Sequence, residues 1–226
     1  MISPASQLRQ KGANDLDGCW NEAALLTFIY VIFTGIFSCT VTAGTDLFVS
    51  GLGTVMSLLL IPMGWGYSMT FLANHRHEDD DPFSIGHLFD GYRDFVRIFL
   101  TLFLQAVYIF LWALLLIIPG IIKALSYAMT PFILRDRPDL KYNGAIELSM
   151  AMMKGHKWDL FWLYLSFIGW AILCVFTFFI GYFWLEPYVT STMANFYEEV
   201  KAEYEGRVFE KPAAGFSESN YSKDER

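Results

Sequence analysis

Residues 98–134 have the sequence IFLTLFLQAVYIFLWALLLIIPGIIKALSYAMTPFIL, in which Lys123 is the only charged residue. A helix needs about 20 apolar residues to cross the hydrocarbon core of a bilayer, so this stretch suits two crossings. Pro119 and Gly120 lie near its middle, where a turn between two helices is expected. Buried helices of soluble proteins seldom run this long without charge. The stretch therefore predicts a transmembrane hairpin.

Two further long stretches are also apolar, with one charged residue in each. Only Asp46 is charged within residues 23–74, and only Glu186 within residues 160–197. Hydrophobic residues make up 54% of the 226-residue chain and charged residues 17%, which leaves little polar material for a water-exposed surface. The sequence predicts an all-α integral membrane protein with six transmembrane helices, at about 22–42, 52–73, 96–117, 120–135, 159–180 and 184–200.

The positive charges indicate an orientation. Of the 16 Lys and Arg residues, all but Lys123 fall in the N-terminal segment, in the loops that follow the first and second hairpins, or after the last helix. Cytoplasmic loops of membrane proteins carry this excess of positive charge. We therefore expect a location in the cytoplasmic membrane, with both termini on the cytoplasmic side.

The chain divides into three units, about 3–77, 81–137 and 138–204. Each hairpin is preceded by an amphipathic or interfacial segment that ends in glycine, at Gly18, Gly91 and Gly155. In the second unit an amphipathic helix is expected to begin at Pro82. Three glycines near the middle of the first apolar stretch, Gly44, Gly51 and Gly53, predict its turn. Residues 1–204 form the predicted membrane domain. Residues 205–226 are rich in Glu, Ser, Lys and Gly, and their few aromatic residues are too scattered to bury a core, so they are predicted to form a disordered tail.

A short motif recurs on the second, returning helix of each hairpin. Tyr67 lies in GYSMT (66–70), Tyr127 in SYAMT (126–130), and Tyr188 in PYVTSTM (187–193). Small and hydroxylated residues allow close packing of membrane helices, and they can also line a polar cleft. If a cleft is present, we expect the returning helices to line it with these residues: Tyr67, Lys123, Tyr127, Thr130, Glu186, Tyr188 and Asn195. Lys123 and Glu186 either pair with each other or extend toward the headgroups.

Evidence for catalysis or metal binding is weak. His75 and His77 in HRHEDDD are the best metal-ligand candidates, but adjacent carboxylates converge poorly on one ion, so no metal site and no cofactor are predicted. The chain contains no nucleophile elbow or phosphate-binding glycine loop. Its net charge of −7 disfavours nucleic acid as a partner. The sequence therefore does not indicate an enzyme.

The second half of the chain resembles a known family. The stretches LLLIIPGIIKALSYAMTPFIL (114–134), MKGHKWDLFWL (153–163) and SFIGWAIL (166–173), with Pro187-Tyr188 and Phe196-Tyr197, are similar to the bacterial membrane family called domain of unknown function 975. The resemblance extends over about residues 20–200 and is most specific in the second half. It implies a multi-pass bacterial membrane protein without an assigned activity.

Two classes of function remain open from the sequence. In the first, the bundle binds or moves a lipid, a small amphiphile or a peptide in a cleft between the returning helices. In the second, the protein is a non-enzymatic membrane scaffold that recruits an unidentified protein through its cytoplasmic loops and tail. The lipid bilayer is a partner in both.

Overall fold

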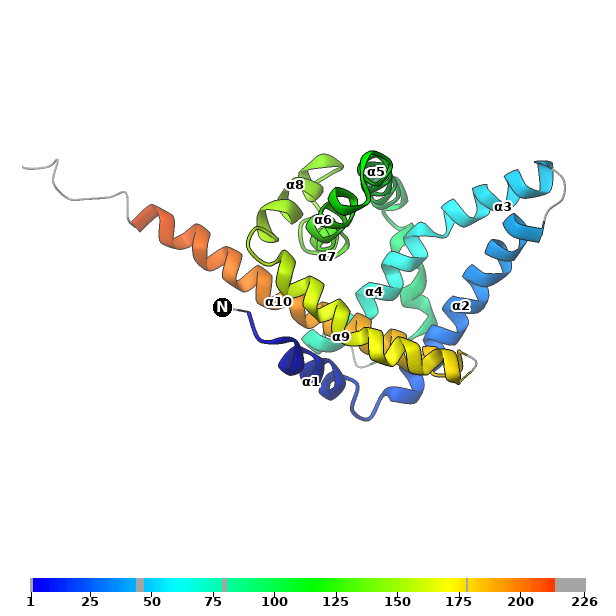
Figure 1. Cartoon of the computed structure of the whole chain (residues 1–226), viewed down its shortest axis with the longest axis horizontal. Coiled ribbons are helices and arrows are strands. Elements are labelled where there is room, and N and C mark those ends of the chain that lie inside the picture. Colours follow the sequence, from blue (N-terminus) through cyan, green and yellow to red (C-terminus); the bar gives the residue numbers. More distant parts are fainter. Residues whose placement is uncertain (1, 44–46, 79–80, 178, 214–226) are drawn as a thin grey trace, which may run out of the picture.

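The computed structural model describes residues 2–43, 47–78, 81–177 and 179–213, and these residues form helices and turns without a strand (Figure 1). The elements in chain order are α1 (Ala5–Asp15), α2 (Trp20–Ala43), α3 (Leu47–Leu59), α4 (Ile61–Arg76), the 3-10 helix η1 (Ile85–Tyr92), α5 (Phe95–Leu115), α6 (Ile117–Tyr127), α7 (Thr130–Asp136), α8 (Asn143–Met152), α9 (Lys157–Phe176) and α10 (Tyr182–Ala213).

Four of the described helical segments are long and apolar enough to cross a membrane. They are Gly53–Arg76, Phe95–Leu115, Ile117–Asp136 and Lys157–Phe176, with mean hydropathies of 1.4, 2.3, 1.6 and 1.8. A fifth is obtained if α1 and the described start of α2, which meet at 94°, form one broken span. The structure thus supports four or five of the six predicted crossings. The crossing at 184–200 stays a prediction, since α10 soon becomes rich in charge.

The positions of the helix breaks differ from those expected. Of the three glycines expected at the first turn, Gly51 and Gly53 lie inside α3, whereas Gly44 is outside the described residues. Leu116, in an extended conformation, separates α5 from α6, so Pro119 falls in the first turn of α6. Proline is tolerated there because its missing N–H would have no helical partner. Gly120 allows close approach instead, because an added Cβ would lie 2.8 Å from Ala113 Cα.

A short helical segment precedes α2, α5 and α9, the first helices of the three predicted hairpins. These segments are α1, η1 and α8. The second is a 3-10 helix that begins at Ile85, so the predicted amphipathic α-helix from Pro82 is wrong in type and boundary. Gly18 (φ 89°) and Gly155 (φ 101°) have the left-handed backbone conformation that glycine adopts without strain. They provide the expected hinges after α1 and α8.

Each of these segments packs on the returning helix of a different hairpin. η1 lies against α4, α8 against α6 and α7, and α1 against α10. The approach of η1 depends on glycine, because a Cβ at Gly66 would lie 2.6 Å from the carbonyl oxygen of Leu88. Ser149 of α8 donates a hydrogen bond to the Ser126 carbonyl (2.9 Å), and Ser191 of α10 donates one to the Gly12 carbonyl (3.0 Å). Small residues therefore permit all three contacts.

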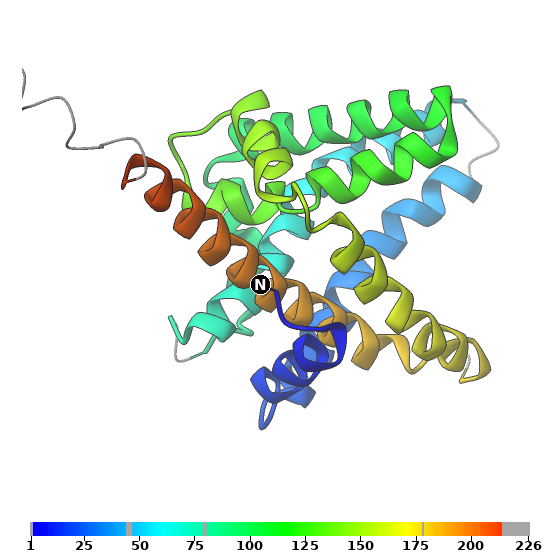
Figure 2. The same cartoon turned by 60° about the vertical axis from the view of Figure 1, so that its left-hand side comes forward.

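The helix pairs α2–α3, α5–α6 and α9–α10 extend from a common base toward one side (Figure 2). The main core lies at this base, where Leu72 of α4, Phe132 of α7 and Phe196 of α10 are buried together. At the tip of the second hairpin, Leu114 and Ile117 are 74% and 75% exposed. Exposed apolar residues at such density are typical of a lipid-facing surface.

The last helix is longer than expected. α10 continues through Ala213, so the predicted boundary between the membrane domain and a disordered tail at residue 205 is corrected for residues 205–213. Residues 214–226 of the predicted tail lie outside the described residues. Figure 1 shows the C-terminal part of α10 extending beyond the other helices.

Candidate functional site

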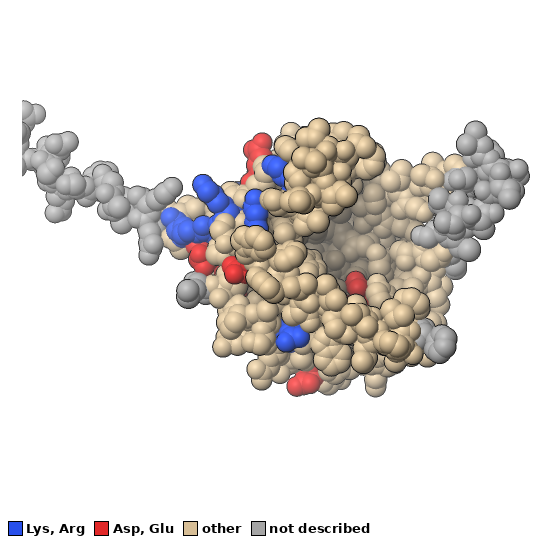
Figure 3. Space-filling view, viewed as in Figure 1, with Lys and Arg blue, Asp and Glu red and all other residues tan. Residues whose placement is uncertain are grey.

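The ends of the returning helices meet in a cluster of charged groups that we call the polar junction: Arg76, Asp136, Tyr197, Glu198 and Lys201. Arg76 donates two hydrogen bonds to Asp136, both 2.8 Å long, and one of 2.7 Å to Glu198. The Asp136 carboxylate also accepts hydrogen bonds from Tyr197 (2.8 Å) and Lys201 (2.6 Å). Figure 3 shows that most of the charged residues visible from this side gather around one end of the molecule. The polar junction joins α4, α7 and α10 electrostatically.

The sequence analysis missed this junction, although the sequence contains a signal for it. Arg76 and Asp136 are 60 positions apart, and Asp136 and Tyr197 are 61 apart. These are the intervals that separate Tyr67, Tyr127 and Tyr188. Arg76, Asp136 and Tyr197 therefore occupy equivalent positions in the three predicted units. Their equal spacing could have indicated that they contact one another.

Asn195 and His75 belong to a second set of polar contacts at the base. His75 Nδ1 lies 2.8 Å from Asp15 Oδ2, and Asn195 donates a hydrogen bond of 2.5 Å to the same oxygen. His77 is the C-cap of α4, with φ 52°, and is exposed. The described residues contain no group of three or more His, Cys, Asp or Glu side chains that could hold a metal ion. His75 thus contributes to packing between α1, α4 and α10.

The remaining residues of the predicted cleft are separated from one another. Tyr67 is buried, its hydroxyl lies 2.8 Å from that of Thr27, and its ring stacks on Tyr30. Tyr127 and Thr130 are buried in the packing of α6 and α7. These residues fill the space between helices, and a common cleft along the returning helices stays a prediction.

Lys123 and Glu186 have different partners. The Lys123 ammonium lies 5.0 Å from the ring centre of Trp112 and 5.9 Å from that of Tyr127. Glu186 instead lies near Tyr182, and the ion pairs of the described residues do not join it to Lys123. The pairing hypothesis is therefore replaced by two separate aromatic environments.

Tyr188 lies beside an apolar pocket at the start of α10. Its ring packs edge-on against that of Phe167, with ring centroids 5.2 Å apart. The ring centroid of Trp20 lies 6.3 Å from that of Tyr188. The pocket has a volume of about 470 Å³ and is also lined by Trp170 and Trp184. Tyr188 is the predicted cleft residue that this pocket includes.

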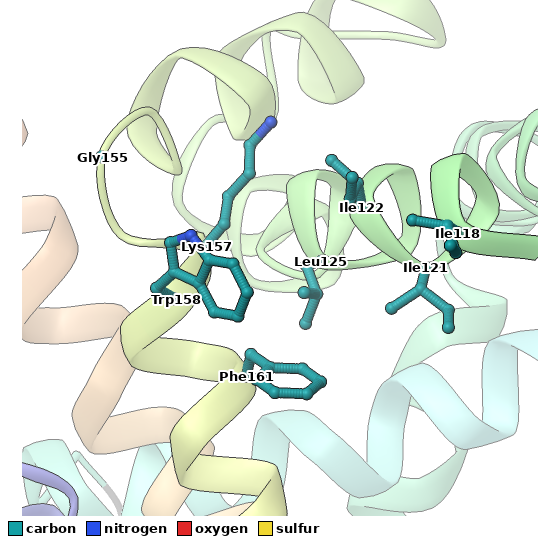
Figure 4. A pocket seen from close by; sticks show the side chains of 8 residues that line it. All are labelled: Ile118, Ile121, Ile122, Leu125, Gly155, Lys157, Trp158 and Phe161. Carbon is teal, nitrogen blue, oxygen red and sulfur yellow. The ribbon is translucent and has the colours of Figure 1, made fainter.

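A second pocket is a groove between α6 and α9, with a volume of about 460 Å³. Figure 4 shows the aromatic rings of α9 facing aliphatic side chains of α6, with the Lys157 side chain at one end. The groove residues are Ile118, Ile121, Ile122, Leu125, Gly155, Lys157, Trp158 and Phe161. Its α6 wall follows the helical i, i+3, i+4, i+7 pattern, a signal that the sequence analysis did not use.

The comparisons with known proteins agree with the resemblance found in the sequence. The family model described as Protein of unknown function (DUF975) matches residues 113–204. The comparisons with curated proteins and with solved structures found no match. The matched segment includes both walls of the groove and Asp136 and Tyr197 of the polar junction. It does not extend to the first hairpin. Residues 113–204 are thus similar to the family called domain of unknown function 975.

Proposed function

We propose that this protein crosses the membrane six times, with both termini in the cytoplasm, and binds an anionic amphiphile in the groove between α6 and α9. The groove itself is the observation that supports this function most strongly. Isoleucine, leucine and phenylalanine side chains form its floor, and a lysine and a tryptophan lie at one end. An amphiphile has the same division between an apolar body and a charged head.

The ends of the groove fit the two parts of such a molecule. Trp158 and Lys157 begin α9, which puts them at the membrane–water interface in the proposed orientation. A basic residue at the interface attracts an anionic headgroup by about 1 kcal/mol. Phe161 and Leu125 lie farther along the groove, where they would contact an acyl chain (Figure 4). We therefore expect a phospholipid with a net negative headgroup.

Lys157→Gln should reduce retention of labelled phosphatidylglycerol on the detergent-purified protein about fivefold, since about 1 kcal/mol of attraction is lost. Retention of phosphatidylcholine should not change. Lys154→Gln is the matched control, because Lys154 is an exposed lysine three positions away that does not line the groove. Native mass spectrometry of the purified variants would count the retained lipids.

A second pair of variants separates the groove from the general lipid-facing surface. Ile121→Trp fills the groove and should reduce retention of both lipids, whereas Leu114→Trp adds the same ring at an exposed hairpin tip and should reduce neither. Equal retention by Lys157→Gln, Ile121→Trp and the unmodified protein would refute the proposal, because the lipids would then be bound elsewhere.

A further inference from the structure

Glu186 is the only charged residue within residues 160–197, and the interactions of the described residues give it no positively charged partner. The titratable side chains that act on it among the described residues are tyrosines, and Tyr182 lies four positions before it on α10. The ion pairs of the described residues lie elsewhere, at the polar junction and on the surface. A charge in such surroundings costs free energy unless it finds a partner, and charged residues within membranes commonly mark ligand pathways.

The tyrosines around Glu186 come from four helices, and we call them the tyrosine cluster: Tyr30 of α2, Tyr67 of α4, Tyr164 of α9 and Tyr182 of α10. Tyr30 and Tyr67 stack with ring centroids 4.7 Å apart and planes 11° apart. Tyr67 is held in place by its contact with Thr27. Tyr67 is therefore fixed in place and buried, whereas Tyr30 is partly exposed.

The outer side of the cluster is open. Tyr164 and Tyr182 are 42% and 36% exposed. Figure 3 shows a hollow surrounded mainly by uncharged atoms, with acidic atoms inside it. The hollow opens among apolar helices, so a molecule that enters it from the bilayer needs an apolar body.

A carboxylate beside tyrosine rings has the chemistry that recognises organic cations. The ring face attracts a cation within about 6 Å, and desolvation strengthens that attraction to about 2 kcal/mol or more. The same chain contains a contact between a cation and aromatic rings, since the Lys123 ammonium lies over the rings of Trp112 and Tyr127. Glu186 supplies one negative charge, which matches a monovalent cation.

We propose that Glu186 and the tyrosine cluster form a binding site for a lipophilic monovalent cation. This site is separate from the groove between α6 and α9: it accepts a positive charge, and its residues do not line that groove. The cationic centre would lie against the Glu186 carboxylate, and the apolar body would occupy the hollow between the hairpins. The negative charge of Glu186 would then be neutralised by the ligand.

The test is equilibrium binding of radiolabelled tetraphenylphosphonium to the full-length protein in a neutral detergent. Glu186→Gln keeps the shape of the side chain and should weaken binding about tenfold or more, because the ion pair is lost. Glu147→Gln, on the exposed face of α8, is the matched control and should bind as the unmodified protein does. Lys157→Gln should also leave cation binding unchanged, which separates this proposal from lipid binding in the groove.

Glu186→Asp keeps the negative charge and should retain measurable binding, whether or not Glu186→Gln folds. Thermal unfolding identifies the folded variants. Equal affinity of folded Glu186→Gln and the unmodified protein would overturn the proposal. It would also be overturned if folded Glu186→Asp bound no more tetraphenylphosphonium than detergent micelles alone.

Discussion

Replacing Asp136 with asparagine should lower the free energy of unfolding by on the order of 3 kcal/mol. The Asp136 carboxylate accepts hydrogen bonds from Arg76, Tyr197 and Lys201, which belong to two other segments of the base. The asparagine amide has one acceptor oxygen and no charge, so the Lys201 ammonium loses its counter-ion, and the Arg76 guanidinium keeps only Glu198 and Glu78 as acidic partners. Leaving a charge largely buried and unpaired is the costly step.

Unfolding in a denaturant series in mild detergent would measure this loss. Asp139→Asn is the control, because Asp139 pairs with Arg137 at the surface and is exposed, so its replacement should change the midpoint little. The double variant Arg76→Gln/Asp136→Asn should lose less than the sum of the two single variants, since the partners interact directly. Additive losses, or a loss for Asp136→Asn as small as for Asp139→Asn, would show that the polar junction does not join the helices.

Gly91→Ala should destabilise the protein by about 2 kcal/mol, because the added methyl group has no room. A Cβ at Gly91 would overlap the Pro62 carbonyl oxygen and would lie 2.9 Å from the carbonyl carbon, so η1 would have to move away from α4. Gly86→Ala is the matched control on the same 3-10 helix, where the nearest atom to an added Cβ is Ser84 Oγ at 3.9 Å. Thermal unfolding of both variants measures the difference, and an equal effect would mean that η1 does not pack on α4 as described.

The long apolar stretches predicted the helical class and most helix positions, because about 20 residues without charge allow few alternatives to a membrane helix. The exact turns were harder to predict. Gly51 and Pro119 both occur inside helices, at α3 and in the first turn of α6. Glycine and proline are frequent where helices end, but they also occur within helices. Local packing decides whether a helix accommodates them.

The candidate site was predicted less well than the fold. The motif tyrosines were expected to line one cleft, whereas Tyr67 and Tyr127 are buried among packed helices and Tyr188 lies beside a separate pocket. Hydroxylated residues satisfy both packing and ligand binding, so residue type alone could not separate the two roles. The groove between α6 and α9 depends on how two helices from different hairpins lie against each other, and the apolar stripe of α6 indicates only one of its walls.

The proposals for the groove and for Glu186 both assume that three transmembrane hairpins extend outward from a cytoplasmic base. Topology reporters fused after Asp46, after Lys141 and after Lys211 test this assumption most directly. The proposed architecture predicts that the fusion after Asp46 reports the outer side, whereas the fusions after Lys141 and Lys211 report the cytoplasm. If the reporters after Asp46 and Lys211 were on the same side of the membrane, the three-hairpin architecture would be contradicted.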